Sequence, residues 1–204
     1  PEENKEPEKD PIDEYISGME LSRKAAQLIM IDLKTAGKGP VTGYNAETEA
    51  SLSEKGWGGV ILFSENLTTT EETLSLTSFL QSSSDIPLFI ATDEEGGRVS
   101  RISSGGGIQG YSVPAAADIK TAGEAFASGE KIGAMLESLG INLDFAPVAD
   151  VRTNPQNSVI GNRSYSSDPY LAADLAVNVY KGIEKSRVFA AAKHFPGHGD
   201  TLAD

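Results

Sequence analysis

The densest group of reactive side chains lies near the end of the sequence, where residues 193–201 read Lys-His-Phe-Pro-Gly-His-Gly-Asp-Thr. Both histidines of the protein, His194 and His198, stand here four residues apart. This spacing suits a metal pair on a helix, but Pro196 and two glycines oppose helix formation, so we predict no metal site. Two interpretations stay open. Lys193 and His194 either bond only to the backbone, or they form the edge of a sugar pocket followed by a mobile loop.

A second group of charged residues is Asp93-Glu94-Glu95, with Arg98 and Arg101 close behind. Adjacent carboxylates can supply a general acid and a base. Consecutive residues at a strand end point in different directions, so we expect one carboxylate to face a pocket while its neighbour packs elsewhere. We favour Asp93 as a ligand-binding residue, because a carboxylate accepts two hydrogen bonds from the neighbouring hydroxyls of a sugar. For Glu95 the alternative is a structural salt bridge to Arg98 or Arg101.

A third candidate is Arg163, on a glycine- and asparagine-rich segment between Asp150 and Asp168. Its guanidinium is either a solvated surface charge or a multi-donor clamp that reaches into a pocket. The spacing alone does not decide between them.

The elements that must position these groups alternate along the chain. Apolar runs predict five strands, at residues 28–33, 59–63, 87–92, 141–148 and 188–193. Between and before them, the patterns predict helices at residues 22–27, 46–55, 70–82, 122–139 and 168–185. Near-continuous apolar strands that alternate with helices indicate a parallel sheet buried on both faces.

Two α/β architectures fit this alternation, a doubly wound sheet and a (β/α)8 TIM-type barrel. The barrel is favoured because the polar groups follow several strands at their carboxyl ends, and because residues 32–39 lack the glycine spacing of a nucleotide-binding turn. A complete barrel needs about 250 residues. We therefore expect residues 15–204 to hold about the first five β/α units of an incomplete barrel domain.

Composition excludes several classes of function. Seventeen basic against thirty acidic residues give a net charge of −13, which disfavours nucleic-acid binding. The absence of cysteine excludes disulfides and thiolate catalysis, and no apolar run reaches the roughly 20 residues of a transmembrane helix. Residues 1–14 are acidic, contain three prolines and read as a frayed terminus or a tether, such as the spacer behind a lipid anchor.

Taken together, the segments resemble family 3 glycoside hydrolases, and specifically their β-N-acetylglucosaminidase branch. The resemblance covers residues 17–204 and is carried by four motifs in the family's order. They are Asp93–Arg101 (DEEGGRVSR), Asn142–Asp150 (NLDFAPVAD), Ile160–Tyr165 (IGNRSY) and Lys193–Thr201 (KHFPGHGDT).

The resemblance implies a set of functional residues and no cofactor. The sugar subsite would use Asp93, Arg101, Arg163, Lys193 and His194. His198 and Asp200 would belong to a mobile loop, and His198 would not be the acid/base. That role is implied for a His–Asp dyad whose Asp matches Asp204 and whose His would lie two residues further on. The nucleophile, an Asp at a later strand end, would also lie outside these 204 residues.

The implied activity is release of terminal β-linked N-acetylglucosamine from peptidoglycan fragments or chitin-derived oligosaccharides, through a covalent glycosyl-enzyme. Alternatives are a non-catalytic carbohydrate-binding barrel, a β-glucosidase-type member of the family, or a metal-dependent hydrolase. The 204 residues alone are expected to be inactive. The location is expected to be extracellular or at the cell surface, with the cytoplasm as the alternative.

Overall fold

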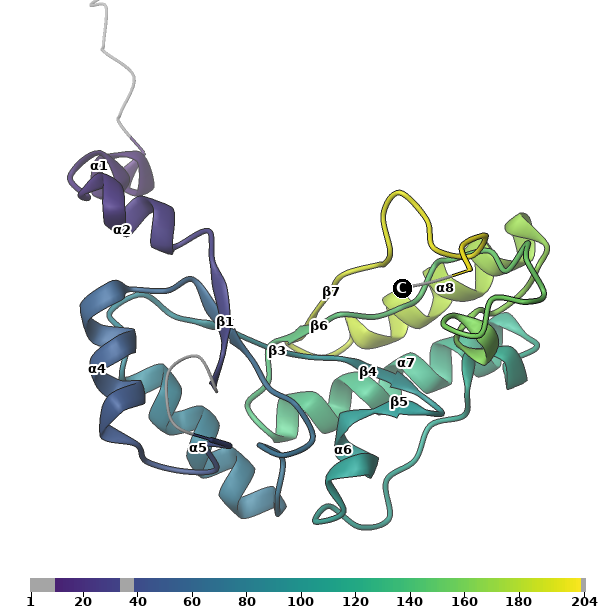
Figure 1. Ribbon diagram of the computed structural model, residues 1–204, viewed down its shortest axis with the longest axis horizontal. Coiled ribbons are helices and arrows are strands. Elements are labelled where there is room, and N and C mark those ends of the chain that lie inside the picture. The colour runs from purple at the N-terminus through teal and green to yellow at the C-terminus, as the bar shows by residue number, and fades with distance from the viewer. Residues whose placement is uncertain (1–9, 34–38, 203–204) are drawn as a thin grey trace, which may run out of the picture.

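The computed structural model describes residues 10–33 and 39–202, which form an α/β fold around one parallel sheet (Figure 1). The strands of this sheet are β1 (Met30–Asp32), β2 (Gly59–Ile61), β3 (Phe89–Thr92), β6 (Leu143–Asp144) and β7 (Phe189–Ala190). The helices are α1 (Pro11–Ser17), α2 (Leu21–Ala26), α4 (Ala46–Lys55), α5 (Thr70–Ser82), α6 (Arg101–Gly105), α7 (Ala122–Ser138) and α8 (Pro169–Ile183), with short 3-10 turns η1 (Ala116–Asp118) and η2 (Gly161–Arg163). The predicted parallel α/β arrangement is thus confirmed.

The strands lie side by side in the order in which they occur along the chain, β1-β2-β3-β6-β7, and every neighbouring pair is parallel. A doubly wound sheet reverses its strand order at a switch point, and this sheet has no such reversal. Right-handed crossovers that always advance in one direction place their helices on one face of the sheet. The order is therefore that of consecutive β/α units and differs from that of a nucleotide-binding sheet.

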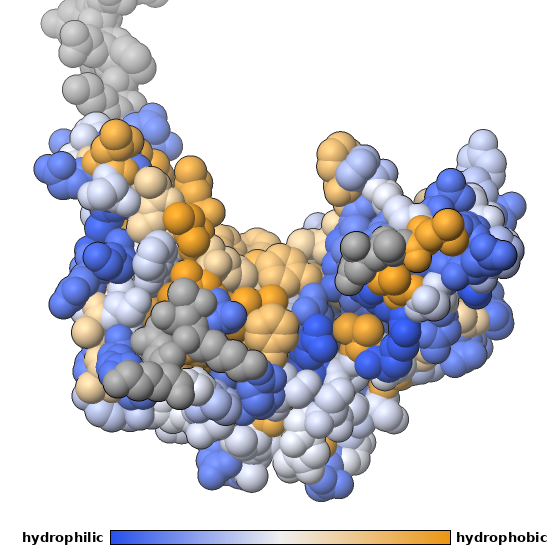
Figure 2. Space-filling view, in the orientation of Figure 1, coloured by the Kyte–Doolittle hydropathy of each residue, from blue (hydrophilic) through white to orange (hydrophobic). Residues whose placement is uncertain are grey.

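The two faces of the sheet differ in their covering. Val60 and Ile90 are fully buried in the core cluster, together with leucines of α5 and α7. Phe89 and Phe189 lie on the opposite face, with ring centroids 5.9 Å apart, and are 47% and 64% exposed. Figure 2 shows a hollow over the middle of the molecule, lined there by hydrophobic side chains.

Local capping explains why several helix boundaries agree with the prediction. Asn45 Oδ1 accepts a hydrogen bond from the Thr48 amide at 2.9 Å, and Gly56 ends α4 in the left-handed conformation at φ 68°. Thr69 opens α5 with a capping box. Asp168 accepts hydrogen bonds from two amides of the first turn of α8. Residues 46–55 and 70–82 are helical as predicted.

The strands are shorter than predicted, and one feature was missed. The pairing of β6 with β7 ends after Asp144 and resumes only around Pro147, where the Lys193 amide donates to the Pro147 carbonyl and Val148 forms a bridge with Lys193. The missed feature is a hairpin of β4 (Glu94–Gly96) and β5 (Val99–Ser100) directly after β3. Its turn needs glycine, because Gly96 and Gly97 both have positive φ, at 81° and 57°.

The N-terminal helices extend away from the sheet (Figure 1). The predicted tether, residues 1–14, falls partly outside the described residues, since the structure describes nothing before Asp10. Its last four residues form the start of α1, which Asp10 caps, so the proposed boundary at residue 14 lies inside a helix. No helix among the described residues has the length and apolar character needed to cross a bilayer.

Candidate active site

The centre of the candidate site is the ammonium group of Lys193, just beyond β7. Its Nζ lies 2.7 Å from Asp93 Oδ1 and 2.6 Å from Glu95 Oε1. Asp93 and Glu95 are two residues apart in an extended segment, so their side chains point to the same side while Glu94 points away. One lysine thereby bridges two carboxylates at the carboxyl end of β3.

Arg163, at the end of η2, binds the same glutamate from the other side. Its Nε and Nη2 donate to the two oxygens of Glu95 at 2.7 and 2.8 Å, which is the bidentate geometry that only arginine provides. The two side chains are 14% and 4% exposed. Of the two interpretations of Arg163, the structure supports the clamp within the site and excludes the solvated charge.

Arg101, the first residue of α6, closes the network at Asp93. Its Nη2 donates to Asp93 Oδ2 at 3.0 Å, and its guanidinium carbon lies 5.4 Å from the centroid of the Phe63 ring. Burial on its own raises the pKa of Asp93, but hydrogen bonds and charges from Lys193 and Arg101 outweigh burial, so this pKa lies below its ordinary value. Asp93 is therefore an ionised acceptor at neutral pH.

His194 connects this network to Asp150, which follows β6. His194 Nδ1 lies 2.6 Å from Asp150 Oδ2, and Nε2 lies 3.2 Å from Arg163 Nη2. A guanidinium can only donate, so we assign Nε2 as an acceptor and Nδ1–H as the donor to Asp150. Its two neighbours thus fix the orientation of the imidazole and the roles of its two nitrogens.

The network alternates in charge and balances overall. The two carboxylates of Asp93 and Glu95 contact three cations directly, namely Arg101, Arg163 and Lys193. A third carboxylate, Asp150, is linked to Arg163 through His194. Hydrogen bonding to Glu95 raises the pKa of Arg163 further. Such a surface offers donors and acceptors without net charge, which suits an uncharged ligand rich in hydroxyl groups.

Beneath the network lies a second carboxylate pair, which no cation contacts within residues 10–33 and 39–202. Glu94 and Asp144 are fully buried, and the Glu94 amide donates to Asp144 Oδ1 at 2.9 Å. Burial raises the pKa of Glu94 to about 7. Burial also raises the pKa of Asp144, and the nearby Glu94 charge adds to this effect. At least one of these carboxyls is thus protonated near neutral pH.

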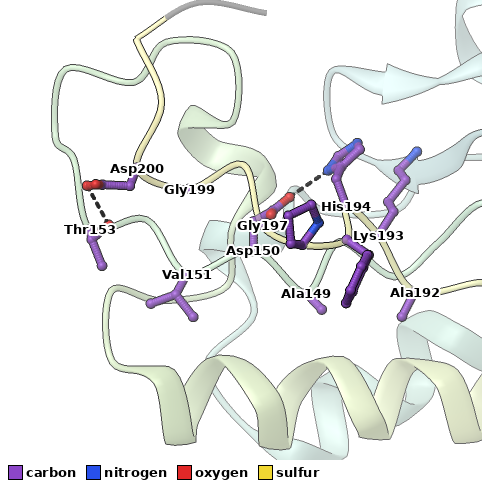
Figure 3. Close-up of a pocket in the computed structure, with 12 residues that line it drawn as sticks. Ala149, Asp150, Val151, Thr153, Ala192, Lys193, His194, Gly197, Gly199 and Asp200 are labelled. Carbon is purple, nitrogen blue, oxygen red and sulfur yellow. Dashed lines mark hydrogen bonds and ion pairs between the residues drawn. The ribbon is translucent and has the colours of Figure 1, made fainter.

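A cavity of about 500 Å³ adjoins Lys193 and His194 on the side of the following loop (Figure 3). Its wall includes Asp200, whose Oδ1 accepts a hydrogen bond from the Thr153 hydroxyl at 2.9 Å. His198 lies at the base of the same loop, and its amide donates to Asp150 Oδ1 at 2.6 Å. The predicted dyad residue, Asp204, lies outside the described residues.

The structure brings the five predicted sugar-binding residues into one network and corrects one alternative. Glu95 pairs with Arg163 and Lys193, so a salt bridge to Arg98 or Arg101 is wrong. Arg98 instead donates to the backbone carbonyls of residues 158–160. The sequence analysis did not select Glu95 and Asp150 as site residues. Their positions, two residues after Asp93 and at the end of the fourth strand, were signals that could have found them.

No group of three or more His, Cys, Asp or Glu side chains that could hold a metal ion occurs among residues 10–33 and 39–202. The imidazoles of His194 and His198 face each other edge to face, with centroids 5.7 Å apart. His194 is engaged by Asp150 and Arg163, and the His198 ring contacts the Thr201 hydroxyl.

Two known proteins are similar to this chain in sequence. β-Hexosaminidase A of Pseudoalteromonas piscicida is 43% identical over 176 residues, which cover 80% of this chain and 29% of that protein. β-Hexosaminidase LpqI of Mycobacterium tuberculosis is 34% identical over 181 residues, or 89% of this chain and 44% of that protein. The chain therefore spans less than half the length of these two relatives.

Solved structures give the same result. A family 3 β-N-acetylglucosaminidase from Paenibacillus sp. superposes with a TM-score of 0.81 at 34% identity, covering 91% of this chain and 35% of that one. NagZ from Neisseria gonorrhoeae gives a TM-score of 0.72 at 32% identity, covering 84% and 49%. Residues 20–204 match the family described as glycosyl hydrolase family 3 N terminal domain. The chain thus belongs to glycoside hydrolase family 3, as the sequence motifs predicted.

Proposed function

We propose that the full-length protein is an exo-acting, retaining β-N-acetylglucosaminidase, and that this chain supplies the part of its barrel that grips the terminal sugar. The observation that carries the proposal is the continuous network from Arg101 through Asp93, Lys193, Glu95 and Arg163 to His194. Its members follow two strands of the parallel sheet, β3 and β7, or lie on α6 and η2, and barrel active sites are likewise assembled from several strand ends and loops. The names of the relatives support an amino sugar as the ligand.

In this proposal the described strands are about the first five units of a (β/α)8 barrel. The uncovered face that carries Phe89 and Phe189 would then be the inner face of the barrel, which later strands enclose. The strand order, which never reverses, supports this assignment.

Each side chain of the network has a task in holding the sugar. Asp93, ionised at neutral pH, accepts hydrogen bonds from sugar hydroxyls, and Lys193 donates to them. Both side chains are 16% exposed, so their outer atoms are accessible to a ligand. Arg163 adds further donors, with His194 fixed beside it, and Glu95 holds both cations in place. Fixed donors and acceptors of this kind orient the glycosidic bond before reaction.

The bond-breaking steps are assigned to groups outside the described residues. An Asp at a later strand end attacks the anomeric carbon and forms a covalent glycosyl-enzyme, which water then hydrolyses. A His–Asp dyad that includes Asp204 protonates the leaving oxygen and later activates water. The preferred substrates are terminal β-linked N-acetylglucosamine units of peptidoglycan fragments or chitooligosaccharides, and an extracellular or cell-surface location fits such polymers.

The test is hydrolysis of nitrophenyl β-N-acetylglucosaminide by the full-length protein, with nitrophenyl β-glucoside as the matched control. We expect release of nitrophenol from the first and little from the second. Preference for the glucoside would support the β-glucosidase alternative. Binding of N-acetylglucosamine without hydrolysis of either substrate, together with a residue other than His two positions after Asp204, would support a non-catalytic binding protein. The chain of 204 residues by itself is expected to be inactive.

A further inference from the structure

We propose that Asp150 is a positioning residue that couples the sugar-binding His194 to the base of the loop formed by residues 195–202. The inference rests on the proposed function and goes beyond it, because it assigns how the loop is held relative to the sugar site. Each oxygen of the carboxylate has a separate task. One orients an imidazole (Figure 3), and the other fixes a backbone amide.

The geometry around Asp150 leaves little freedom. Oδ2 receives His194 Nδ1 at 2.6 Å, and Oδ1 receives the His198 amide at 2.6 Å, with the carboxylate only 1% exposed. The backbone is also held, since the Ser164 hydroxyl donates to the Asp150 carbonyl at 2.7 Å. A buried carboxylate deprived of its donors is costly, so the carboxylate, the imidazole and the loop amide are expected to stay together.

Asn157 holds the same point of the loop from the other side. Its Nδ2 donates to the His198 carbonyl at 2.6 Å, its Oδ1 accepts from the Ile160 amide at 2.9 Å, and the residue is fully buried. Both backbone polar groups of His198 are thus bound by buried side chains of the segment after β6. We call Asp150, Asn157 and the His198 backbone the loop anchor.

Gly199 shows that the anchor continues for one residue beyond His198. A Cβ built there would lie 1.8 Å from the Val151 carbonyl oxygen, so the chain runs too close to its neighbour for any side chain. Asp200, by contrast, is an exposed residue whose contacts with Thr153 and Asn154 are also exposed. Motion of the loop is therefore expected to begin after Gly199, and His198 belongs to its fixed base.

The loop anchor connects the base of the loop to the proposed sugar-binding groups through hydrogen bonds. Asn157 lies on the segment that carries Arg163, and Arg98 fixes residues 158–160 of that segment. A displacement at His198 would therefore be passed to His194 through Asp150 and to the Arg163 segment through Asn157. The base of the loop is therefore held by the same residues that position the proposed sugar-binding groups.

The test compares Asp150→Asn and Asn157→Ala in the full-length protein, with Asp174→Asn on the exposed face of α8 as the matched control. An amide at residue 150 can still accept from the His198 amide, but it presents a donor to His194 and reverses the tautomer. We expect kcat/KM of Asp150→Asn to fall about 100-fold, mainly through KM, because small displacements of binding groups have effects of this size. Asn157→Ala is expected to lower kcat about tenfold, with KM within about twofold of wild type.

A double-mutant cycle with His194→Gln separates positioning from general damage. If Asp150 acts on KM through His194, adding Asp150→Asn to His194→Gln changes KM by less than about twofold. Independent, multiplicative losses would overturn the proposal. An unchanged kcat in Asn157→Ala would also overturn the proposal. If Asp150→Asn shows no cooperative thermal transition and is therefore not folded, the kcat of Asn157→Ala is the deciding measurement.

Hydrogen exchange tests the anchor without any catalysis. The amide of His198 should be protected in the wild type and exchange at least about tenfold faster in Asp150→Ala, while the amides of α8 stay unchanged. An unprotected His198 amide in the wild type would overturn the anchor whether or not the protein is an enzyme. Conversely, a protected amide in a protein that hydrolyses no N-acetylglucosaminide would contradict the proposed function and leave the anchor standing.

Discussion

Two carboxylate pairs lie on either side of the segment that follows β3, and their environments are opposite. Asp93 and Glu95 both contact Lys193, and each also receives an arginine. Glu94, which lies between them in the sequence, is fully buried, and its carboxylate accepts from the Ile102 amide while its own amide donates to Asp144. No cation contacts Glu94 or Asp144 among the described residues. The pKa of Asp93 is lowered, whereas burial raises that of Glu94 to about 7. Strand alternation, and not sequence proximity, therefore separates charged binding groups from protonated structural ones.

The largest effect is expected when the cation shared by Asp93 and Glu95 is removed. Replacing Lys193 with Met keeps an unbranched apolar stem but removes the ammonium group, and it leaves the carboxylates of Asp93 and Glu95 together without their shared cation. We expect kcat/KM to fall about 10²- to 10³-fold, in the range found when one fixed donor is removed. Stability should fall by about 3 kcal/mol, because a mostly buried ion pair is broken from one side.

Steady-state kinetics and denaturant unfolding of the full-length protein check this, with Lys181→Met on the exposed face of α8 as control. A Lys193→Met protein with wild-type kcat/KM would show that the network is structural only.

A smaller effect is expected when the charge is kept and the geometry is lost. Arg163→Lys retains a cation near Glu95 but cannot make the two parallel hydrogen bonds at 2.7 and 2.8 Å. It also removes the donor to His194. We expect kcat/KM to fall about tenfold, equivalent to about 1.4 kcal/mol. The matched control is Arg187→Lys, where the arginine is 96% exposed. Equal behaviour of the two variants would show that only charge matters at residue 163.

The protonated pair gives a pH-dependent effect on stability. The pKa of Glu94 in the folded state, about 7, is above its ordinary value of 4.5. The stability it contributes is thus fully present below about pH 4.5 and is lost as the pH rises through about 7. Glu94→Gln should remove this loss of stability. The change in the free energy of unfolding between pH 5 and pH 8 should therefore be smaller in Glu94→Gln than in the wild type, by roughly 2 kcal/mol.

Denaturant unfolding at a series of pH values measures this difference, with Glu130→Gln on the outside of α7 as control. The same slope of stability against pH in Glu94→Gln and in the wild type would mean that Glu94 is ionised in the folded protein. The contrast between the two pairs would then be wrong.

Much of the fold could be predicted because its signals are local. Asn45 and Gly56 mark both ends of α4, and Thr69 with Glu72 marks the start of α5, so these helices were predicted from a few residues. The ends of the strands were not, since they depend on which backbone groups find partners in other strands. The interruption between Asp144 and Pro147 is an example.

The composition of the site was predicted better than its connections. Asp93, Lys193 and His194 were singled out by residue type and position, and Arg163 through the family resemblance, but their contacts join residues up to 100 positions apart. A salt bridge from Glu95 to Arg98 or Arg101 was the alternative because these arginines follow closely in the sequence. The hairpin at Gly96–Gly97, which directs Arg98 away from Glu95, has no apolar pattern from which it could be predicted. Asp150 follows a predicted strand, yet its role depends on His194, which lies 44 residues later, and on the path of the loop after His194.

The central claim is that this ionic network holds the terminal amino sugar, and a crystal structure of the full-length protein with N-acetylglucosamine tests it most directly. The account predicts sugar hydroxyls within hydrogen-bond distance of Asp93, Lys193 and His194, with the Arg163–Glu95 pair unchanged. A sugar bound elsewhere on the protein, with Asp93, Lys193 and His194 out of contact, would contradict it.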